Sequence, residues 1–237
     1  RKHSASFYTP RSIVSFMIDE SLFFHFKQSL TISHLKPTML DHKLRQLLSR
    51  KLNNPFNDLP NITWQIIYTI SRYKIFDPAC GSGAFIIGVL NKLTHVLAKL
   101  DPDNTIWKKV QIQRITEESK IYFSKNMYHT THTQIEHCNV IFDTYSTQNA
   151  NYLRKYYLIK HCLYGADNQA TAIQIVQLRL SLSLMADRSL FIPGQRCKNS
   201  YNTDLNKASD HSVLLSYSDS HFVVTNTLMI TDNTSRL

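Results

Sequence analysis

The sequence has few glycines, no clustered cysteines and no long apolar run. It contains 5 Gly in 237 residues, so the pair in Gly81-Ser82-Gly83 is a local feature and not background. The four cysteines are far apart and form no Cys-x-x-Cys pair, which argues against a zinc site or a disulfide framework. No stretch approaches the roughly 18 to 20 apolar residues of a membrane helix, and no signal-peptide core is present at the amino terminus. We therefore expect a soluble, cytoplasmic protein with no membrane partner.

Acidic residues are also scarce relative to basic ones. The 27 Lys and Arg residues outnumber the 17 Asp and Glu residues, which gives a net charge of +10. Such a balance favours a polyanionic partner such as nucleic acid, although solvated lysines alone produce the same figure. The hydrophobic content of 43% is ample for a buried core, so a globular chain is expected.

The central feature of the sequence is a short apolar run that breaks into a small-residue turn and restarts as a helix, at Ile75 to Ile86. The pattern predicts a strand, a ligand-cradling loop and a helix start. Glycine tolerates positive φ and allows a ligand to approach the backbone, and the free amides of a helix N-terminus suit a polar or anionic group. The residues alone therefore indicate a nucleotide-like binding turn.

Helical patterns surround this turn. Residues 1–72 read as a helical amino-terminal region, in which Thr9 is expected to cap a helix that begins at Pro10. Apolar residues at intervals of three and four predict a long helix from Phe85 to Leu100. Residues 104–158 are polar and aromatic, and weak periodicity predicts a helical insertion there.

Two further strands are predicted after the insertion. Cys162 to Asp167 forms a short apolar run that ends in a carboxylate, and a strongly apolar helix follows from Thr171 to Ala186. The run Phe222 to Val224 predicts a third strand with a polar tip. Three units of strand and turn indicate an open α/β sheet whose ligand lies across the carboxyl ends of the strands. There, Asp167 can accept both hydroxyls of a ribose, or it can cap the helix that follows.

The segment Asp77 to Phe85 resembles the S-adenosylmethionine-binding motif of adenine-specific DNA methyltransferases from restriction-modification systems, especially the large single-chain restriction and methylation enzymes. Phe7-Tyr8-Thr9-Pro10 is similar to the Tyr-Thr-Pro element that precedes the motif in that family, and Leu163 to Asp167 is similar to its acidic second-strand motif. The resemblance implies an incomplete, Rossmann-like methyltransferase sheet in residues 73–237, interrupted by the 104–158 insertion and preceded by the helical region 1–72.

The resemblance also implies a set of cofactor contacts. Asp77 anchors the turn and the amino acid end of S-adenosylmethionine, the backbone of the turn lines the pocket, and the Tyr-Thr-Pro element closes over the methionine part. Asp167 holds the ribose hydroxyls, Asn168 lies beside the adenine ring, and Asn226 bonds the adenine amine. The expected cofactor-binding residues are therefore Tyr8, Thr9, Pro10, Asp77, Ala79, Cys80, Gly81, Ser82, Gly83, Asp167, Asn168 and Asn226. We assign no catalytic and no metal-binding residue.

One family feature is missing from the sequence. The Asn-Pro-Pro-Tyr motif, whose polar groups receive the target adenine and whose ring stacks on the flipped base, has no counterpart. Asn226-Thr227-Leu228-Met229 lacks both prolines and the aromatic ring, and Asn199 is a weaker rival for the third-strand contact. We expect cofactor binding without methylation by this chain alone. Double-stranded DNA is then a partner of a complete enzyme that has a carboxyl-terminal catalytic and target-recognition portion.

Two other interpretations stay open. A non-catalytic remnant or a basic DNA-binding module accounts for the charge without a working pocket. A dinucleotide-dependent oxidoreductase agrees less well with the sequence. Ile86 occupies the third glycine position of that fingerprint, and Asp167 lies 84 residues after Gly83 where roughly 20 are expected.

Overall fold

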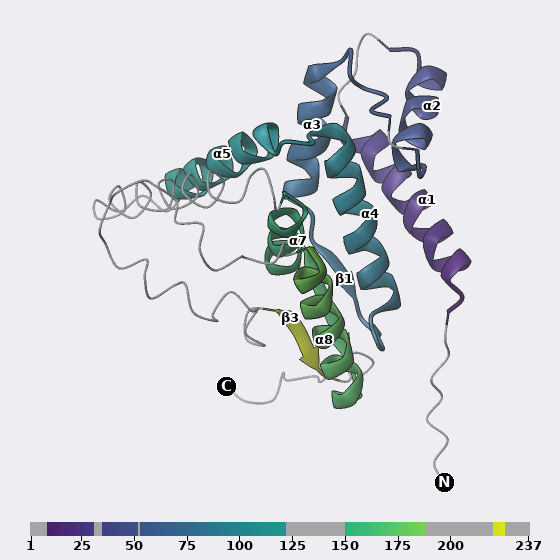
Figure 1. The fold of residues 1–237 in the computed structure, drawn as a ribbon, viewed down its shortest axis with the longest axis vertical. Helices are drawn as coiled ribbons and strands as arrows, with labels where there is room; N and C mark the ends of the chain where they lie inside the picture. The colour runs from purple at the N-terminus through teal and green to yellow at the C-terminus, as the bar shows by residue number, and fades with distance from the viewer. Residues whose placement is uncertain (1–8, 31–34, 52, 122–149, 188–219, 226–237) are drawn as a thin grey trace, which may run out of the picture.

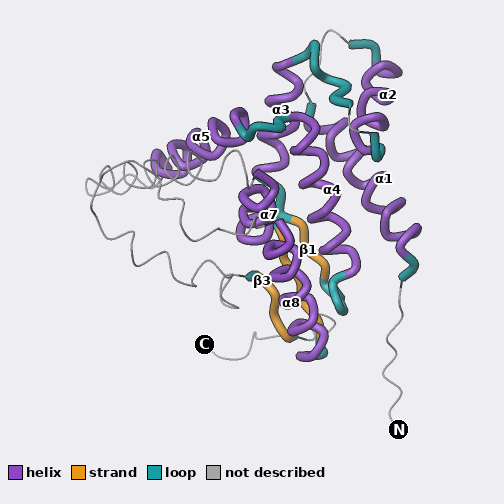
Figure 2. The backbone as a smooth tube through the Cα atoms, in the orientation of Figure 1, coloured by secondary structure: helices purple, strands orange, loops and turns teal. Residues whose placement is uncertain are grey.

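The computed structural model describes residues 9–30, 35–51, 53–121, 150–187 and 220–225. Helices dominate these residues and a small sheet lies among them (Figures 1 and 2). The helices are Arg11–Ser29 (α1), Pro37–Leu48 (α2), Pro60–Ser71 (α3), Ala84–Leu100 (α4), Thr105–Ile121 (α5), Ala150–His161 (α7) and Ala170–Asp187 (α8). The strands are Ile75–Asp77 (β1), Leu163–Asp167 (β2) and His221–Val224 (β3).

The three strands form one open, parallel sheet in the order β1-β2-β3. Ile75 pairs with Leu163, and Tyr164 pairs with His221. Because the strands are parallel, their carboxyl ends meet at one edge, and the helices that follow β1 and β2 begin there. The prediction of a mixed α/β fold with an open sheet is confirmed.

The predicted helices are present with small shifts at their ends. The long helix after the turn is α4, the weak periodicity of the insertion corresponds to α5 and α7, and the helix after the second strand is α8. The expected capping by Thr9 is wrong, because α1 begins at Arg11 and Pro10 occupies the N-cap without a side-chain cap. Pro10 has extended backbone, with ψ 142°, which moves the helix start one residue further on.

Helix α4 lies at the centre of the hydrophobic core. Leu90, Leu93, Val96 and Leu97 are fully buried, and α1, α2, α3 and α7 all pack on this helix. Gly88 permits the close approach of α1, which runs beside α4 in Figure 1. A Cβ at this position would lie 2.6 Å from Cδ1 of Ile18. The packing of α1 on α4 fixes the amino-terminal helix relative to the glycine turn.

A buried lysine joins α4 to the end of α2. The Lys99 side chain is 5% exposed, and its Nζ donates to the carbonyl oxygen of Leu47 at 2.8 Å and to those of Gln46 and Ser49. Gln46 and Leu47 belong to the last turn of α2 and Ser49 follows its end, where carbonyl groups lack most of their intrahelical partners. Of the three, the Gln46 carbonyl also accepts from the Ser49 N–H at 3.2 Å. Burial and the charge of Lys92 lower the pKa of Lys99. Lys99 therefore caps a neighbouring helix from inside the core.

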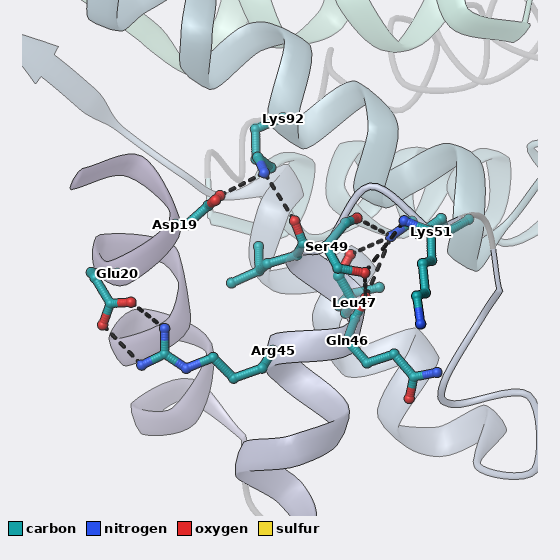
Figure 3. A network of polar contacts seen from close by, with 10 residues as sticks. Asp19, Glu20, Arg45, Gln46, Leu47, Ser49, Lys51 and Lys92 are labelled. Carbon is teal, nitrogen blue, oxygen red and sulfur yellow. Dashed lines mark hydrogen bonds and ion pairs between the residues drawn. The ribbon is translucent and has the colours of Figure 1, made fainter. Parts of the chain in front are cut away.

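Two ion pairs complete this junction (Figure 3). Lys92 of α4 lies 2.6 Å from the Asp19 carboxylate and donates to the Leu48 carbonyl oxygen at 2.9 Å. Arg45 of α2 makes a bidentate contact with Glu20 of α1. Together these contacts join α1, α2 and α4. In the described part of the chain, no helix combines the length and apolar character needed to cross a membrane.

Candidate ligand-binding site

The turn between β1 and α4 is built around two glycines in left-handed conformations. Gly81 has φ 52° and Gly83 has φ 81°. Space around Gly81 is open, whereas a Cβ on Gly83 would lie 2.2 Å from Cγ2 of Val176 in α8. Gly83 is therefore required twice, for its backbone conformation and for the close approach of α8.

Backbone amides of the turn are fixed by the ends of both neighbouring strands. Oδ1 of Asp77 accepts from the Ala79 N–H at 3.1 Å, so this side chain holds the turn at the end of its own strand. The Cys80 N–H donates to the Ala166 carbonyl oxygen at 3.0 Å, and the Gly81 N–H donates to Oδ2 of Asp167 at 2.9 Å. The turn is thus fastened to β2 by backbone and side chain.

Asp167 makes two structural contacts, of which the sequence anticipated only the one at the start of the next helix. While Oδ2 accepts from Gly81, Oδ1 accepts from the Gln169 N–H at 2.9 Å, directly before α8. The alternative in which this aspartate organises the start of the next helix is therefore present in the structure. An ionised carboxylate offers about four acceptor positions. Two of them remain for ligand hydroxyls.

Negative charge concentrates at this turn. Burial raises the pKa of Asp77 and the charge of Asp167 raises it further, although the Ala79 hydrogen bond acts in the opposite sense. Burial and the same two carboxylates raise the pKa of the Cys80 thiol to about 12. Arg179 of α8 contacts the turn from the outside, where its Nη1 donates to the Ser82 carbonyl oxygen at 2.6 Å. The two carboxylates and the thiol thus share one electrostatic environment that favours a cation.

A groove runs beside β1 and ends at the turn. Its volume is about 590 Å³, within the range of small-molecule sites. Helix α1 contributes Met17 and Ser21 to its wall, the end of β1 contributes Asp77, and the turn and the start of α4 contribute Pro78 and Phe85. The wall is mostly apolar, and it also carries the Asp77 carboxylate and the basic side chains of Arg72 and Lys74. This composition suits an amphipathic ligand with a polar group directed at the turn.

The structure brings most of the predicted cofactor residues to one end of the molecule. Asp77, the turn from Ala79 to Gly83, and Asp167 are in direct contact, and Asn168 follows them as an exposed residue. Thr9 and Pro10 precede α1, whose first turn lies at the same end as the start of α4 in Figure 1. Tyr8, Asn226 and the rival Asn199 lie outside the described residues.

Three contributors were not anticipated from the sequence. Val176 packs on Gly83, Arg179 bonds Ser82, and the Ala166 carbonyl receives the Cys80 amide. Val176 and Arg179 are three residues apart on one side of α8, and this spacing is the only sign in the sequence that both could contact the turn.

Comparison with protein families, with characterised proteins and with solved structures finds no match to this chain.

Proposed function

We propose that the chain binds S-adenosylmethionine at the Asp77–Gly83 turn, as the cofactor-binding part of a site-specific DNA adenine methyltransferase. In the complete enzyme the methyl group is transferred to the exocyclic amine of adenine in DNA. The order of the sequence motifs supports the family, and the turn geometry supports a small ligand at the carboxyl ends of parallel strands.

The observation that carries the proposal is the pair of carboxylates at the turn. Asp77 and Asp167 come from adjacent strands; burial raises the pKa of Asp77, and the charge of Asp167 acts in the same direction. S-adenosylmethionine bears an ammonium and a sulfonium, so its positive charges relieve the repulsion between the two carboxylates. The pyrophosphate of a dinucleotide would add to that repulsion. The charge of the site therefore favours S-adenosylmethionine over a nicotinamide cofactor.

Each part of the ligand has a residue suited to it. The Asp77 carboxylate is placed to bind the ammonium of the methionine part. The unused acceptor positions of Asp167 suit the two ribose hydroxyls, and Asn168 follows on the side where the base would extend. The apolar groove that Met17 and Phe85 line continues from Asp77. Thr9 and Pro10 stand at the start of α1, beside the same end of α4.

Calorimetry with S-adenosylmethionine tests the proposal. We expect the wild-type chain to bind it and to bind NADH at least tenfold more weakly. Asp77→Ala is expected to abolish binding, because it removes the partner of the ammonium. Asp58→Ala is the matched control, since Asp58 is an exposed carboxylate in the segment between α2 and α3. Equal affinities of wild type and Asp77→Ala, with unchanged circular dichroism, would place the pocket elsewhere.

The chain alone is proposed to bind the cofactor without methylating DNA. The sequence has no Asn-Pro-Pro-Tyr to receive a flipped adenine. Incubation with duplex DNA and methyl-labelled S-adenosylmethionine is expected to leave the DNA unlabelled. Labelled adenine would show that acceptor groups exist elsewhere in the chain.

The net charge of +10 favours a second candidate, a basic module that binds DNA without a cofactor. Calorimetry with S-adenosylmethionine and with duplex DNA distinguishes the two functions. Absence of heat with S-adenosylmethionine, together with salt-sensitive binding of duplex DNA, would establish the module and reject the cofactor site.

A further inference from the structure

The two faces of the sheet differ in what they carry. Successive side chains of a strand point to opposite faces, and paired residues of neighbouring strands share a face. One face bears Leu163 and Phe222, which are 0% and 6% exposed and belong to the hydrophobic core. The other face bears Phe76, Tyr164 and His221, which stand opposite one another in the strand register. We call these three residues the aromatic row.

The aromatic row is accessible. Phe76 is 59% exposed, His221 is exposed and Tyr164 is half-buried. The rings of Tyr164 and His221 are stacked, with centroids 4.5 Å apart and planes 14° apart. His221 is further fixed by a 2.8 Å hydrogen bond between its Nε2 and the Lys160 carbonyl oxygen. The rings are thus held in place by the sheet and by the end of α7.

Lysines lie at the edge of the aromatic row. Lys74 is two residues before Phe76 and therefore on the same face, and its Nζ donates to the Tyr164 hydroxyl at 2.8 Å and to the His161 carbonyl oxygen at 2.7 Å. Lys160 lies next to His161, at the end of α7. Within the described residues, neither lysine forms an ion pair with a carboxylate. No carboxylate of the described residues therefore neutralises either lysine by direct contact.

The pKa of His161 reflects an excess of positive charge around this side chain. Burial, together with the positive charges of Arg114, Lys160, Lys74 and His221, lowers the pKa of this imidazole to about 3. Four basic side chains from different elements therefore converge near the amino ends of the strands. The carboxylate of Glu117 is 3.3 Å from Arg72.

We propose that the aromatic row and its two lysines, Lys74 and Lys160, form a binding surface for single-stranded nucleic acid. Exposed rings stack on bases of any sequence, and ammonium groups contact the phosphates that connect those bases. The surface lies toward the amino ends of the strands, whereas the glycine turn lies at their carboxyl ends. Phe76 and Lys74 also line the groove beside β1, whereas Tyr164, His221 and Lys160 do not. The surface therefore adjoins the proposed cofactor site, and it adds a partner other than duplex DNA.

Fluorescence anisotropy with 5′-labelled oligonucleotides of 20 thymidines or 20 uridines tests the surface, with the full chain and without cofactor. Phe76→Ala is expected to weaken binding about fivefold or more, which is the loss of one stacked base. Phe24→Ala is the matched control, because Phe24 on α1 is 57% exposed and outside the row. His221→Ala is the second row variant and is expected to act in the same direction.

Salt dependence tests the lysines separately. Lys74→Gln and Lys160→Gln are each expected to reduce the slope of log affinity against log salt by about 0.7, the value for one phosphate contact in a single strand. Lys51→Gln, at an exposed position after α2, is expected to leave the slope unchanged. Thymidine and uridine oligonucleotides distinguish DNA from RNA as the natural ligand.

Several outcomes would overturn the inference. The surface is not a nucleic-acid site if neither oligonucleotide binds at low salt, or if Phe76→Ala and Phe24→Ala lose affinity equally. Parallel sheets are generally covered on both faces, so a protein layer is the competing occupant. If the row variants change the oligomeric state in size-exclusion chromatography and leave oligonucleotide affinity unchanged, the face is a protein interface. Retained S-adenosylmethionine binding in His221→Ala and Lys160→Gln, which change residues outside the groove, would show that the cofactor proposal does not depend on this surface.

Discussion

The backbone N–H of Gly81 donates a 2.9 Å hydrogen bond to the carboxylate of Asp167, although the two residues are 86 positions apart. This bond connects the glycine turn to the next strand of the sheet. The Cys80 amide makes a parallel connection to the Ala166 carbonyl oxygen. The turn is thus a joint between β1 and β2, and its shape depends on both strands.

Replacement of Asp167 is expected to weaken the fold as well as the candidate site. Asp167→Ala leaves the amides of Gly81 and Gln169 without their acceptor, which costs about 1 to 3 kcal/mol in the free energy of unfolding. Asp167→Asn keeps one acceptor oxygen and is expected to lose less. Urea unfolding followed by circular dichroism measures both, with Asp103→Ala as an exposed control. An unchanged midpoint for Asp167→Ala would mean that water replaces the carboxylate without cost.

The two glycines of the turn are expected to respond differently to alanine. Gly81→Ala meets only the strain of a left-handed backbone, about 1 kcal/mol, because no atom lies within 4 Å of the added Cβ. Gly83→Ala adds a collision with Val176 and is expected to cost about 2 to 4 kcal/mol in total. The double variant Gly83→Ala/Val176→Ala should lose less free energy of unfolding than the sum of the losses of the two single variants. Strictly additive unfolding energies would contradict the close contact.

The buried His161 makes stability depend on pH. Burial and neighbouring cations lower its pKa from 6.5 to about 3. Between these pH values, His161 is therefore protonated in the unfolded chain and neutral in the folded chain. The free energy of unfolding should therefore fall as the pH is lowered from about 6.5, by at most about 1.4 kcal/mol per pH unit from this group. Asp77, whose pKa is raised, acts in the opposite sense below neutral pH.

The His161→Gln variant isolates this contribution. Glutamine cannot titrate, so the pH profile of its unfolding energy should be flatter than that of the wild type between pH 4 and 6.5. His42→Gln serves as a control on α2. Identical profiles for His161→Gln and the wild type would show that the imidazole gains its proton in the folded state.

Lys99 is expected to be among the most sensitive lysines in the described core. Lys99→Met keeps the apolar stem and leaves the carbonyl groups at the end of α2 without their buried donor, at a cost of about 1 to 3 kcal/mol. Lys51→Met removes an exposed charge close to the same helix end and should be nearly neutral. Thermal unfolding monitored at 222 nm compares the two. Equal melting temperatures would mean that water satisfies the carbonyl groups in the absence of Lys99.

The positions of the elements followed from local patterns. The apolar residues of α4 recur at intervals of three and four, and β2 and β3 are short apolar runs bounded by polar residues, so period and length were sufficient. The start of α1 was misjudged because Thr9-Pro10 matches a capping pattern, whereas Pro10 itself has extended backbone. The local sequence does not determine which of two adjacent residues is the last one with non-helical backbone angles before the helix.

Contacts between distant segments were beyond the sequence. The aromatic row depends on the register that places Phe76 opposite Tyr164 and Tyr164 opposite His221, and nothing within one strand specifies that register. No local pattern indicates the burial of Lys99, because its carbonyl partners lie at the end of another helix. The predicted roles of Tyr8 and Asn226 concern residues outside the described part of the chain. They stay predictions, as do the ligand contacts of Asp77 and Asp167.

The hydrogen bond between Gly81 and Asp167 also bears on the order in which contacts form during folding. During synthesis the glycine turn leaves the ribosome long before β2, so its amides have no carboxylate to meet for the next 86 residues. Non-local contacts of this kind form late, after the intervening chain has been brought into register. The nascent helices α1 to α4 can pack beforehand, since their contacts are closer in sequence. A newly made chain should thus acquire its helical core first and its ligand site last.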